Sequence, residues 1–190
     1  MIGHKNCGLI IVRPHYTLMI LYIVIAFVLL IVALFIWGVV RLRKGNAQAA
    51  EAIRKVRIED LVGLVAEGRA GIKKGFGVSI DLSDREAAAK ILDSLFTNQM
   101  KLKGTFERPG SNWHFVLPVG ALVGEFIRIH AKGAWKENPE GLLMEIPVKD
   151  GSATCYPFNK VLKQVSSGEK GDLYAFLLSS TQLSSVGRVA

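Results

Sequence analysis

The sequence predicts a single-pass transmembrane α-helix, followed by a juxtamembrane helix and an α+β domain with a mainly antiparallel sheet. Three patterns predict this fold class: an uncharged apolar run near the N-terminus, a helical apolar period after it, and a period of two in the second half. These patterns divide the 190-residue chain into a short N-terminal tail (1–15), a transmembrane helix (16–40), a basic juxtamembrane or stalk helix (41–70), a soluble α+β domain (76–178) and a flexible C-terminal tail (179–190).

The apolar run of residues 16–40 contains no charged side chain. As a helix it rises about 37 Å, which is enough to cross a hydrocarbon core of roughly 30 Å with some tilt. Tyr16 and Trp37 lie near its two ends, where amphipathic rings favour the headgroup level. A cleaved signal peptide is the alternative. Signal peptides have a shorter apolar core that is followed by a small-residue cleavage site, and this run is longer and is not followed by such a site. The run therefore predicts a retained membrane span.

Basic residues flank the span unequally. Lys5 and Arg13 precede it. The larger group, a predicted membrane-surface basic cluster, follows it and comprises Arg41, Arg43, Lys44, Arg54, Lys55 and Arg57. Because Lys and Arg near a span resist translocation, we expect the N-terminus outside and the C-terminal domain in the cytoplasm. The opposite topology remains open, since Lys5, Arg13 and the α-amino group also form a positive cluster.

The net charge of +8 comes largely from these juxtamembrane residues. Contacts with anionic headgroups would contribute about 1 kcal/mol for each cation. The cluster lacks interleaved aromatic residues, so we expect no nucleic-acid binding. Cys7 and Cys155 lie on opposite sides of the span and cannot form a disulfide within one chain.

A helix over residues 47–67 is predicted by apolar residues at helical spacing. They are Ile53, Val56, Leu61, Leu64 and Val65. Residues 68–77 then contain four glycines with the cations Arg69, Lys73 and Lys74. We expect a flexible turn that closes the stalk helix. A loop that binds an anion through its backbone N–H groups is the speculative alternative, although neither a Walker A loop nor a dinucleotide-binding fingerprint is present.

The soluble domain opens with a predicted short strand at 78–82 and a helix through residue 96, which begins at a capping box of Ser83 and Glu86. Alternating residues then predict an antiparallel meander of four strands. The strands are expected at 100–106, 113–117, 126–131 and 142–148, with turns at 108–112, 137–141 and 149–152. Pro147 suits an edge strand.

The last part of the chain has a weaker pattern. Pro157 fits the first turn of a helix through Val165. Residues 172–178 are apolar and suit either a strand or a helix, and residues 179–190 are small and polar enough to fray.

Motifs for catalysis are absent from the sequence. The four histidines, His4, His15, His114 and His130, have no Cys, His or carboxylate partner at metal-ligand spacing. Haem ligation by His15 lacks a second axial partner in the sequence. We therefore expect no catalytic residue, no cofactor, no metal and no enzymatic activity.

The sequence favours a non-enzymatic accessory or scaffold subunit of a larger membrane complex. Its expected partners are the lipid bilayer and other subunits, including a second copy of itself. The alternative is a membrane-tethered sensor that holds a small anionic ligand near Arg69, Lys73 and Lys74, or near Trp113 and Trp135. A membrane-anchored enzyme with scattered site residues is the third hypothesis.

Overall fold

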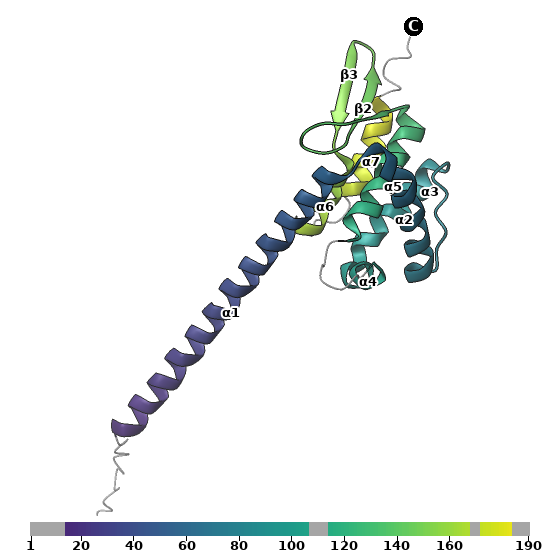
Figure 1. Cartoon of the computed structure of the whole chain (residues 1–190). Helices are drawn as coiled ribbons and strands as arrows, with labels where there is room; N and C mark the ends of the chain where they lie inside the picture. Colours follow the sequence, from purple (N-terminus) through teal and green to yellow (C-terminus); the bar gives the residue numbers. More distant parts are fainter. Residues whose placement is uncertain (1–13, 107–113, 168–171, 184–190) are drawn as a thin grey trace, which may run out of the picture. The chain divides into compact units, whose positions relative to one another are not determined.

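The computed structural model describes residues 14–106, 114–167 and 172–183 (Figure 1). The chain divides into two compact units, residues 1–43 and residues 44–190. Helix α1 (Pro14–Lys55) begins in the first unit and ends in the second.

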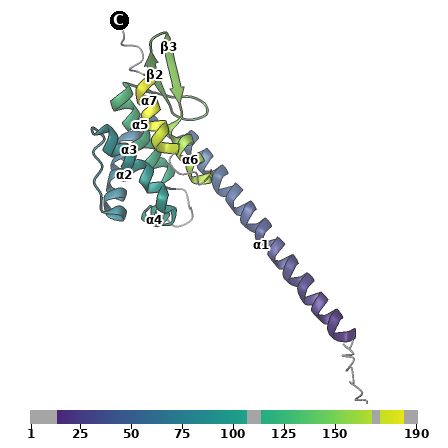
Figure 2. The same ribbon diagram turned by 180° about the vertical axis from the view of Figure 1, so that it is seen from behind.

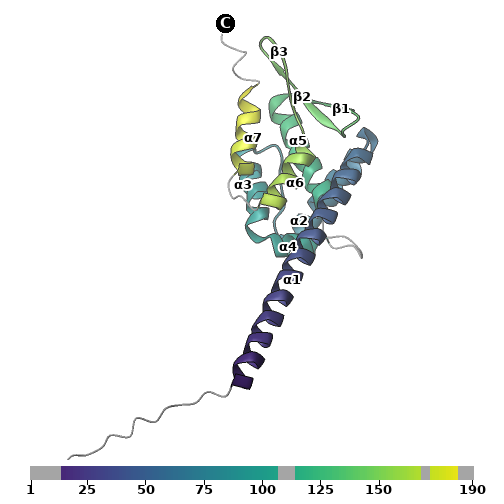
Figure 3. The same ribbon diagram turned by 90° about the vertical axis from the view of Figure 1, so that its left-hand side faces the viewer.

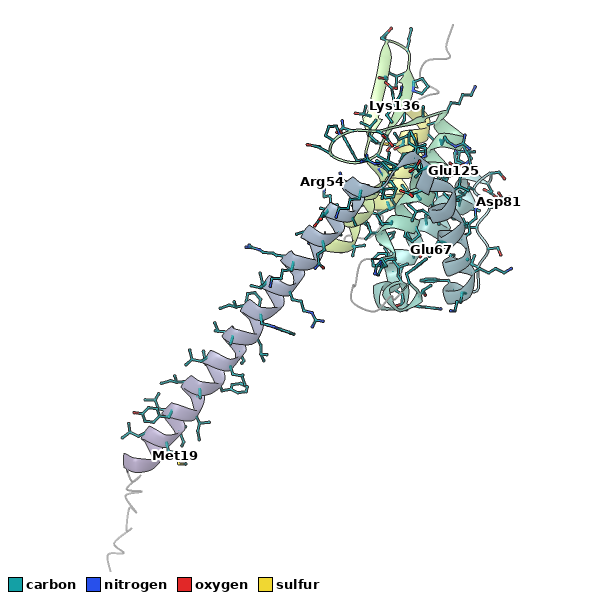
Figure 4. All side chains as sticks on the ribbon, viewed as in Figure 1. Met19, Arg54, Glu67, Asp81, Glu125 and Lys136 are labelled. Atoms are coloured by element: carbon teal, nitrogen blue, oxygen red, sulfur yellow. The ribbon has the colours of Figure 1, made fainter. Side chains whose placement is uncertain are left out.

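Within the first unit, α1 confirms the predicted helix over residues 16–40. Its large apolar side chains from Leu18 to Trp37 are all exposed, and Figure 4 shows them standing out on every side of the helix. In the part of the chain that the structure describes, α1 is the one helix long and apolar enough to cross a membrane. The Arg41 guanidinium lies 5.2 Å from the centre of the Trp37 ring, a cation–π contact at the end of the apolar segment.

The predicted helix over residues 47–67 is confirmed only in part, because Val56 and Arg57 interrupt it. Helix α1 ends at Lys55, the short 3-10 helix η1 (Ile58–Asp60) follows, and α2 (Leu61–Phe76) then begins. Arg57 is extended, and its backbone N–H donates to the Asp60 carboxylate over 2.9 Å. This local hydrogen bond replaces the intrahelical one that a continuous helix would make.

The predicted turn at 68–77 is wrong, since these residues form the second half of α2. The helix ends at Gly77, whose φ of +71° is left-handed and whose N–H donates to the Lys73 carbonyl over 3.0 Å. Three of the glycines, Gly68, Gly71 and Gly75, lie three and four residues apart. That spacing places them on one helix face.

Those three glycines let other parts of the domain approach α2 closely. A Cβ at Gly68 would lie 2.8 Å from the Pro118 carbonyl oxygen, and Cβ atoms at Gly71 and Gly75 would clash with Phe106 and Thr105. The glycines therefore serve helix packing.

The helix expected after residue 83 is confirmed as α3 (Arg85–Ser94), but its cap differs from the prediction. Asp84 is the N-cap, and its Oδ1 accepts from the Ala87 N–H over 3.0 Å. The Ser83 hydroxyl instead donates to Asp81 over 2.7 Å. The predicted strand at 78–82 is wrong, because these residues have no regular secondary structure.

Substitution of Asp84 tests its assignment as the N-cap of α3. We expect Asp84→Ala to lower the free energy of unfolding by about 1 kcal/mol, because the Ala87 N–H loses its acceptor. Ser83→Ala is the matched control and should cost less, since among the described residues the Ser83 hydroxyl bonds to Asp81, which is exposed. Chemical denaturation measures both. An equal or larger loss in Ser83→Ala would contradict the assignment.

Two of the four predicted strands are helices. Residues 95–105 form the 3-10 helix η2 (Leu95–Asn98) and α4 (Gln99–Thr105), and residues 126–131 belong to α5 (Val116–Ala131). Of the strand predicted at 113–117, Trp113 lies outside the described residues and residues 116–117 begin α5. The error in α5 has a clear cause: the helix is buried on nearly all sides, so it shows no amphipathic helical period.

The sheet has three antiparallel strands in the order β1 (Ala134–Lys136), β2 (Leu143–Val148), β3 (Gly151–Cys155) (Figure 3). The strand predicted at 142–148 and the turns on both sides of it are confirmed. Pro147 lies on the central strand, so the edge-strand prediction is wrong. A proline, which has no backbone N–H, is tolerated at position 147 because β1 has already ended there: β1 pairs only with residues 143–145.

The described part of the chain ends with two helices, α6 (Pro157–Ser167) and α7 (Asp172–Leu183). Pro157 is the first residue of its helix, as predicted. Residues 179–183 continue α7, which corrects the start of the predicted tail, and residues 184–190 lie outside the described part.

Helix α5 is the centre of the second unit. It contacts α2, α3, α6, α7 and β2, and Figure 2 shows the helices around it from behind. Large buried side chains such as Phe115, Phe126 and Phe158 fill the core. Ile53 and Ile72 are buried in the same core, and the compact second unit begins at Lys44, upstream of the predicted domain start at residue 76. The unit is mostly helical with a small antiparallel sheet, an α+β architecture.

Candidate functional site

An apolar groove of about 700 Å³ opens on the surface of the second unit. Its walls come from η1 and α2, from the C-terminal half of α5, and from β1. The lining residues are Ile58, Leu61, Val62, Val65, Ala66, Arg69, Glu125, Arg128 and Trp135. The volume is within the range of small-molecule sites in proteins. Glu125, labelled in Figure 4, marks the α5 wall.

One face of α2 forms the long wall of the groove. Leu61, Val65 and Arg69 are spaced by four residues and therefore lie in line along one side of the helix. The line from Leu61 to Arg69 is about 12 Å long, at 1.5 Å per residue. The wall is apolar along most of its length and ends in a single guanidinium.

Trp135 closes the groove from β1. Its indole packs against Gly124 so closely that a Cβ there would clash with the ring. Its ring centre also lies 5.7 Å from that of Phe158, and its backbone pairs with Met144 of β2. These contacts fix a half-buried aromatic wall, which sequence reasoning could identify only as a candidate.

The two cations of the groove differ in their surroundings. Arg128 donates two hydrogen bonds to Glu125, from Nε over 2.8 Å and from Nη2 over 2.7 Å. The hydrogen bonds to Glu125 raise the pKa of Arg128, so this cation is already paired. Arg69 has no ion-pair or hydrogen-bond partner among the described residues. The groove thus offers one cation without a direct ion pair beside an apolar wall, and Arg69 has only a longer-range attraction to the exposed Asp81.

The structure brings together two residues that the sequence analysis kept apart. Arg69 was predicted in an anion-binding loop and Trp135 near a ligand groove, and both line the same groove. Lys73 and Lys74 are exposed near the end of α2 and are not among its lining residues. Since residues 68–76 are helical, the loop prediction is corrected, while anion binding by Arg69 stays a prediction. Trp113 lies outside the described residues.

The predicted basic cluster is divided along the chain. Arg41 and Arg43 belong to the first unit, and the other four cations belong to the second. Arg54, labelled in Figure 4, lies about 15 Å along α1 from Lys44, which exceeds the Debye length of roughly 8 Å at physiological salt. Lys55 pairs with Glu51 over 2.7 Å on the exposed helix surface. Along the chain the six cations therefore form two groups, Arg41, Arg43 and Lys44 followed by Arg54, Lys55 and Arg57.

The histidine and the cysteine that could serve as a metal ligand or a nucleophile pack against other parts of the domain. His130 Nε2 lies 2.8 Å from the Leu82 carbonyl oxygen, and its ring packs against Phe126. Burial raises the pKa of the Cys155 thiol to about 11, which leaves it protonated at neutral pH. Across the described residues, no group of three or more His, Cys, Asp and Glu side chains could hold a metal ion.

Comparison with known proteins gives no match: no protein family, no curated protein and no solved structure corresponds to this chain. The groove and the exposed apolar segment of α1 are the features on which a function can be argued.

Proposed function

We propose that the chain is a single-pass membrane protein and a non-enzymatic accessory or scaffold subunit of a larger membrane complex. The observation that carries this proposal is the combination, in one chain, of a fully exposed apolar helix with a compact domain that has an apolar surface groove. The membrane segment would hold the domain at the bilayer. The basic residues after it favour a cytoplasmic domain and an external N-terminus.

The physical advantage of such an anchor is local concentration. A domain tethered to the same bilayer as its partner meets that partner at an effective concentration of roughly millimolar for short linkers. A weak contact surface is then sufficient for stable assembly. Ile58 is 45% exposed and Val62 is 81% exposed at the groove, which supplies apolar surface for such a contact.

Membrane integration is tested by extraction. We expect the full chain to stay in the membrane pellet at pH 11 in carbonate, because about 25 apolar residues cross the bilayer. A chain that begins at Lys44 should be released. The N-terminus of the mature protein is determined by mass spectrometry in the same sample. Cleavage after the apolar segment would identify a signal sequence and refute the proposal.

Orientation is tested with Cys7. In intact cells a membrane-impermeant maleimide should label Cys7, which the proposed topology places outside. Cys155 does not report the topology, because its half-buried thiol stays protonated on either side of the membrane. Cys7→Ser removes the expected signal and is the control. Labelling that appears only after permeabilisation would reverse the topology.

The subunit role is tested by gentle solubilisation and pulldown through a C-terminal tag, followed by mass spectrometry. We expect partners in fixed stoichiometry that are lost as the detergent becomes harsher. A monodisperse monomer in every detergent would contradict the proposal.

A membrane-tethered sensor of a small anionic ligand is the second candidate, supported by the meeting of Arg69 and Trp135 in one groove. It predicts that an anionic metabolite or nucleotide raises the melting temperature of the full chain in detergent. Arg69→Gln should abolish the rise. A panel that produces no shift removes the support for this candidate.

A further inference from the structure

We propose that the groove is the docking site for one amphipathic helix of a partner protein. The helix would place apolar side chains, spaced at i, i+3 or i+4, and i+7, along α2, and a carboxylate against Arg69. This inference rests on the proposed subunit function and specifies its contact.

The exposed apolar side chains at the groove favour a protein partner. In the described part of the second unit, four large apolar side chains are well exposed: Ile58, Val62, Val78 and Ile129. Two of them, Ile58 and Val62, line the groove. Apolar surface gathered at one concave site is typical of interaction sites, whereas scattered single residues are not.

The shape of the groove favours a helix over a small molecule. Val62 is 81% exposed, so it stands at the open rim, and a ligand seated between the walls would leave it in water. A helix with its side chains is about 10 Å across and would cover the rim as well as the walls. The apolar line on α2, about 12 Å long, matches roughly two turns of a docked helix.

The charges of the groove specify the partner further. Glu125 already satisfies Arg128, so the guanidinium of Arg69, which lacks a direct ion pair among the described residues, is the site for an additional carboxylate. Arg69 lies at one end of the apolar line, so the carboxylate would lie at one end of the docked helix. This position fixes the end of the groove at which the partner's carboxylate lies, and so the register of the docked helix.

The test uses the full chain in native membranes with a photo-crosslinking amino acid at position 62. The matched control carries it at position 78, which is also an exposed valine but does not line the groove. We expect a protein adduct from position 62 only. The crosslinked peptide should lie in an amphipathic helix that has the stated apolar spacing and a carboxylate within one turn of its end.

Charge reversal is the second arm. Arg69→Glu should reduce recovery of the crosslinked partner at least tenfold, because two carboxylates would then face each other. Lys73→Glu makes the same charge change on α2 outside the groove and should leave recovery within twofold. Changing the partner's carboxylate to Lys should restore recovery with Arg69→Glu. Melting curves of both variants verify that they fold.

The outcomes separate this inference from the proposed function. Partners that co-purify with no adduct at position 62 overturn the groove as the docking site and leave the subunit role intact. An adduct with a lipid, with a second copy of this chain, or with a non-helical segment overturns the proposed occupant. Absence of both partners and adducts overturns the subunit role and the inference together.

Discussion

A fragment of residues 76–190 is expected not to fold, whereas a fragment of residues 44–190 is expected to fold cooperatively. The shorter fragment lacks the end of α1, η1 and nearly all of α2. It therefore loses buried apolar side chains of the core, namely Ile53, Val56, Leu61 and Ile72. Removing one such side chain costs about 2–5 kcal/mol, and the total stability of a domain is about 5–15 kcal/mol.

Circular dichroism and thermal melting measure this difference. The longer fragment should give a helical spectrum and one melting transition, while the shorter one should give neither. The comparison is informative because the sequence patterns alone favour residue 76 as the start. Cooperative melting of the 76–190 fragment would show that α2 is dispensable and would restore that boundary.

Two glycines in α2 are expected to respond oppositely to the same substitution. A Cβ at Gly68 would meet the Pro118 carbonyl oxygen at 2.8 Å and Leu122 Cδ1 at 2.7 Å, so Gly68→Ala forces α2 and α5 apart. We expect a loss of about 1–3 kcal/mol. Gly63 has nothing within 4 Å of its added Cβ, so Gly63→Ala should gain about 0.5–1 kcal/mol through helix propensity.

Because both sites are in one helix, each variant controls for the other. At about 2–4 °C per kcal/mol for a domain of this size, Gly68→Ala should lower the melting temperature and Gly63→Ala should raise it. Chemical denaturation of residues 44–190 gives the free energies directly. Equal effects of one sign at both positions would contradict the packing of α2 on α5.

The elements that the sequence predicted well have a strong local signal. The apolar run of α1, the helix after Asp84, the strand β2 with the turn that follows it and the start of α6 at Pro157 all depend on residues adjacent in sequence. Their structure follows from propensity, capping and turn chemistry, which short-range patterns report.

The errors concern residues whose structure depends on distant partners. Residues 126–131 alternate by chance, but they belong to helix α5, which is buried among five other elements. The glycines of α2 suggested a loop, although their spacing of three and four residues was the available signal for a packed helix face. The groove could not be predicted, because Arg69 and Trp135 are brought together by the packing of α2 on α5 and of Trp135 on Gly124.

The first residues of the second unit are synthesised well before the residues that they contact in the folded domain. Gly141 lies against Ile53, and the Ser166 hydroxyl donates to Asn46 across 120 residues of sequence. At about 5–20 residues per second, the ribosome takes roughly 6–24 s to make the later partner after the earlier one. During that interval the apolar faces of the end of α1 and of α2 are open to chaperones, so nascent-chain folding of this domain is completed only when α6 and α7 have emerged.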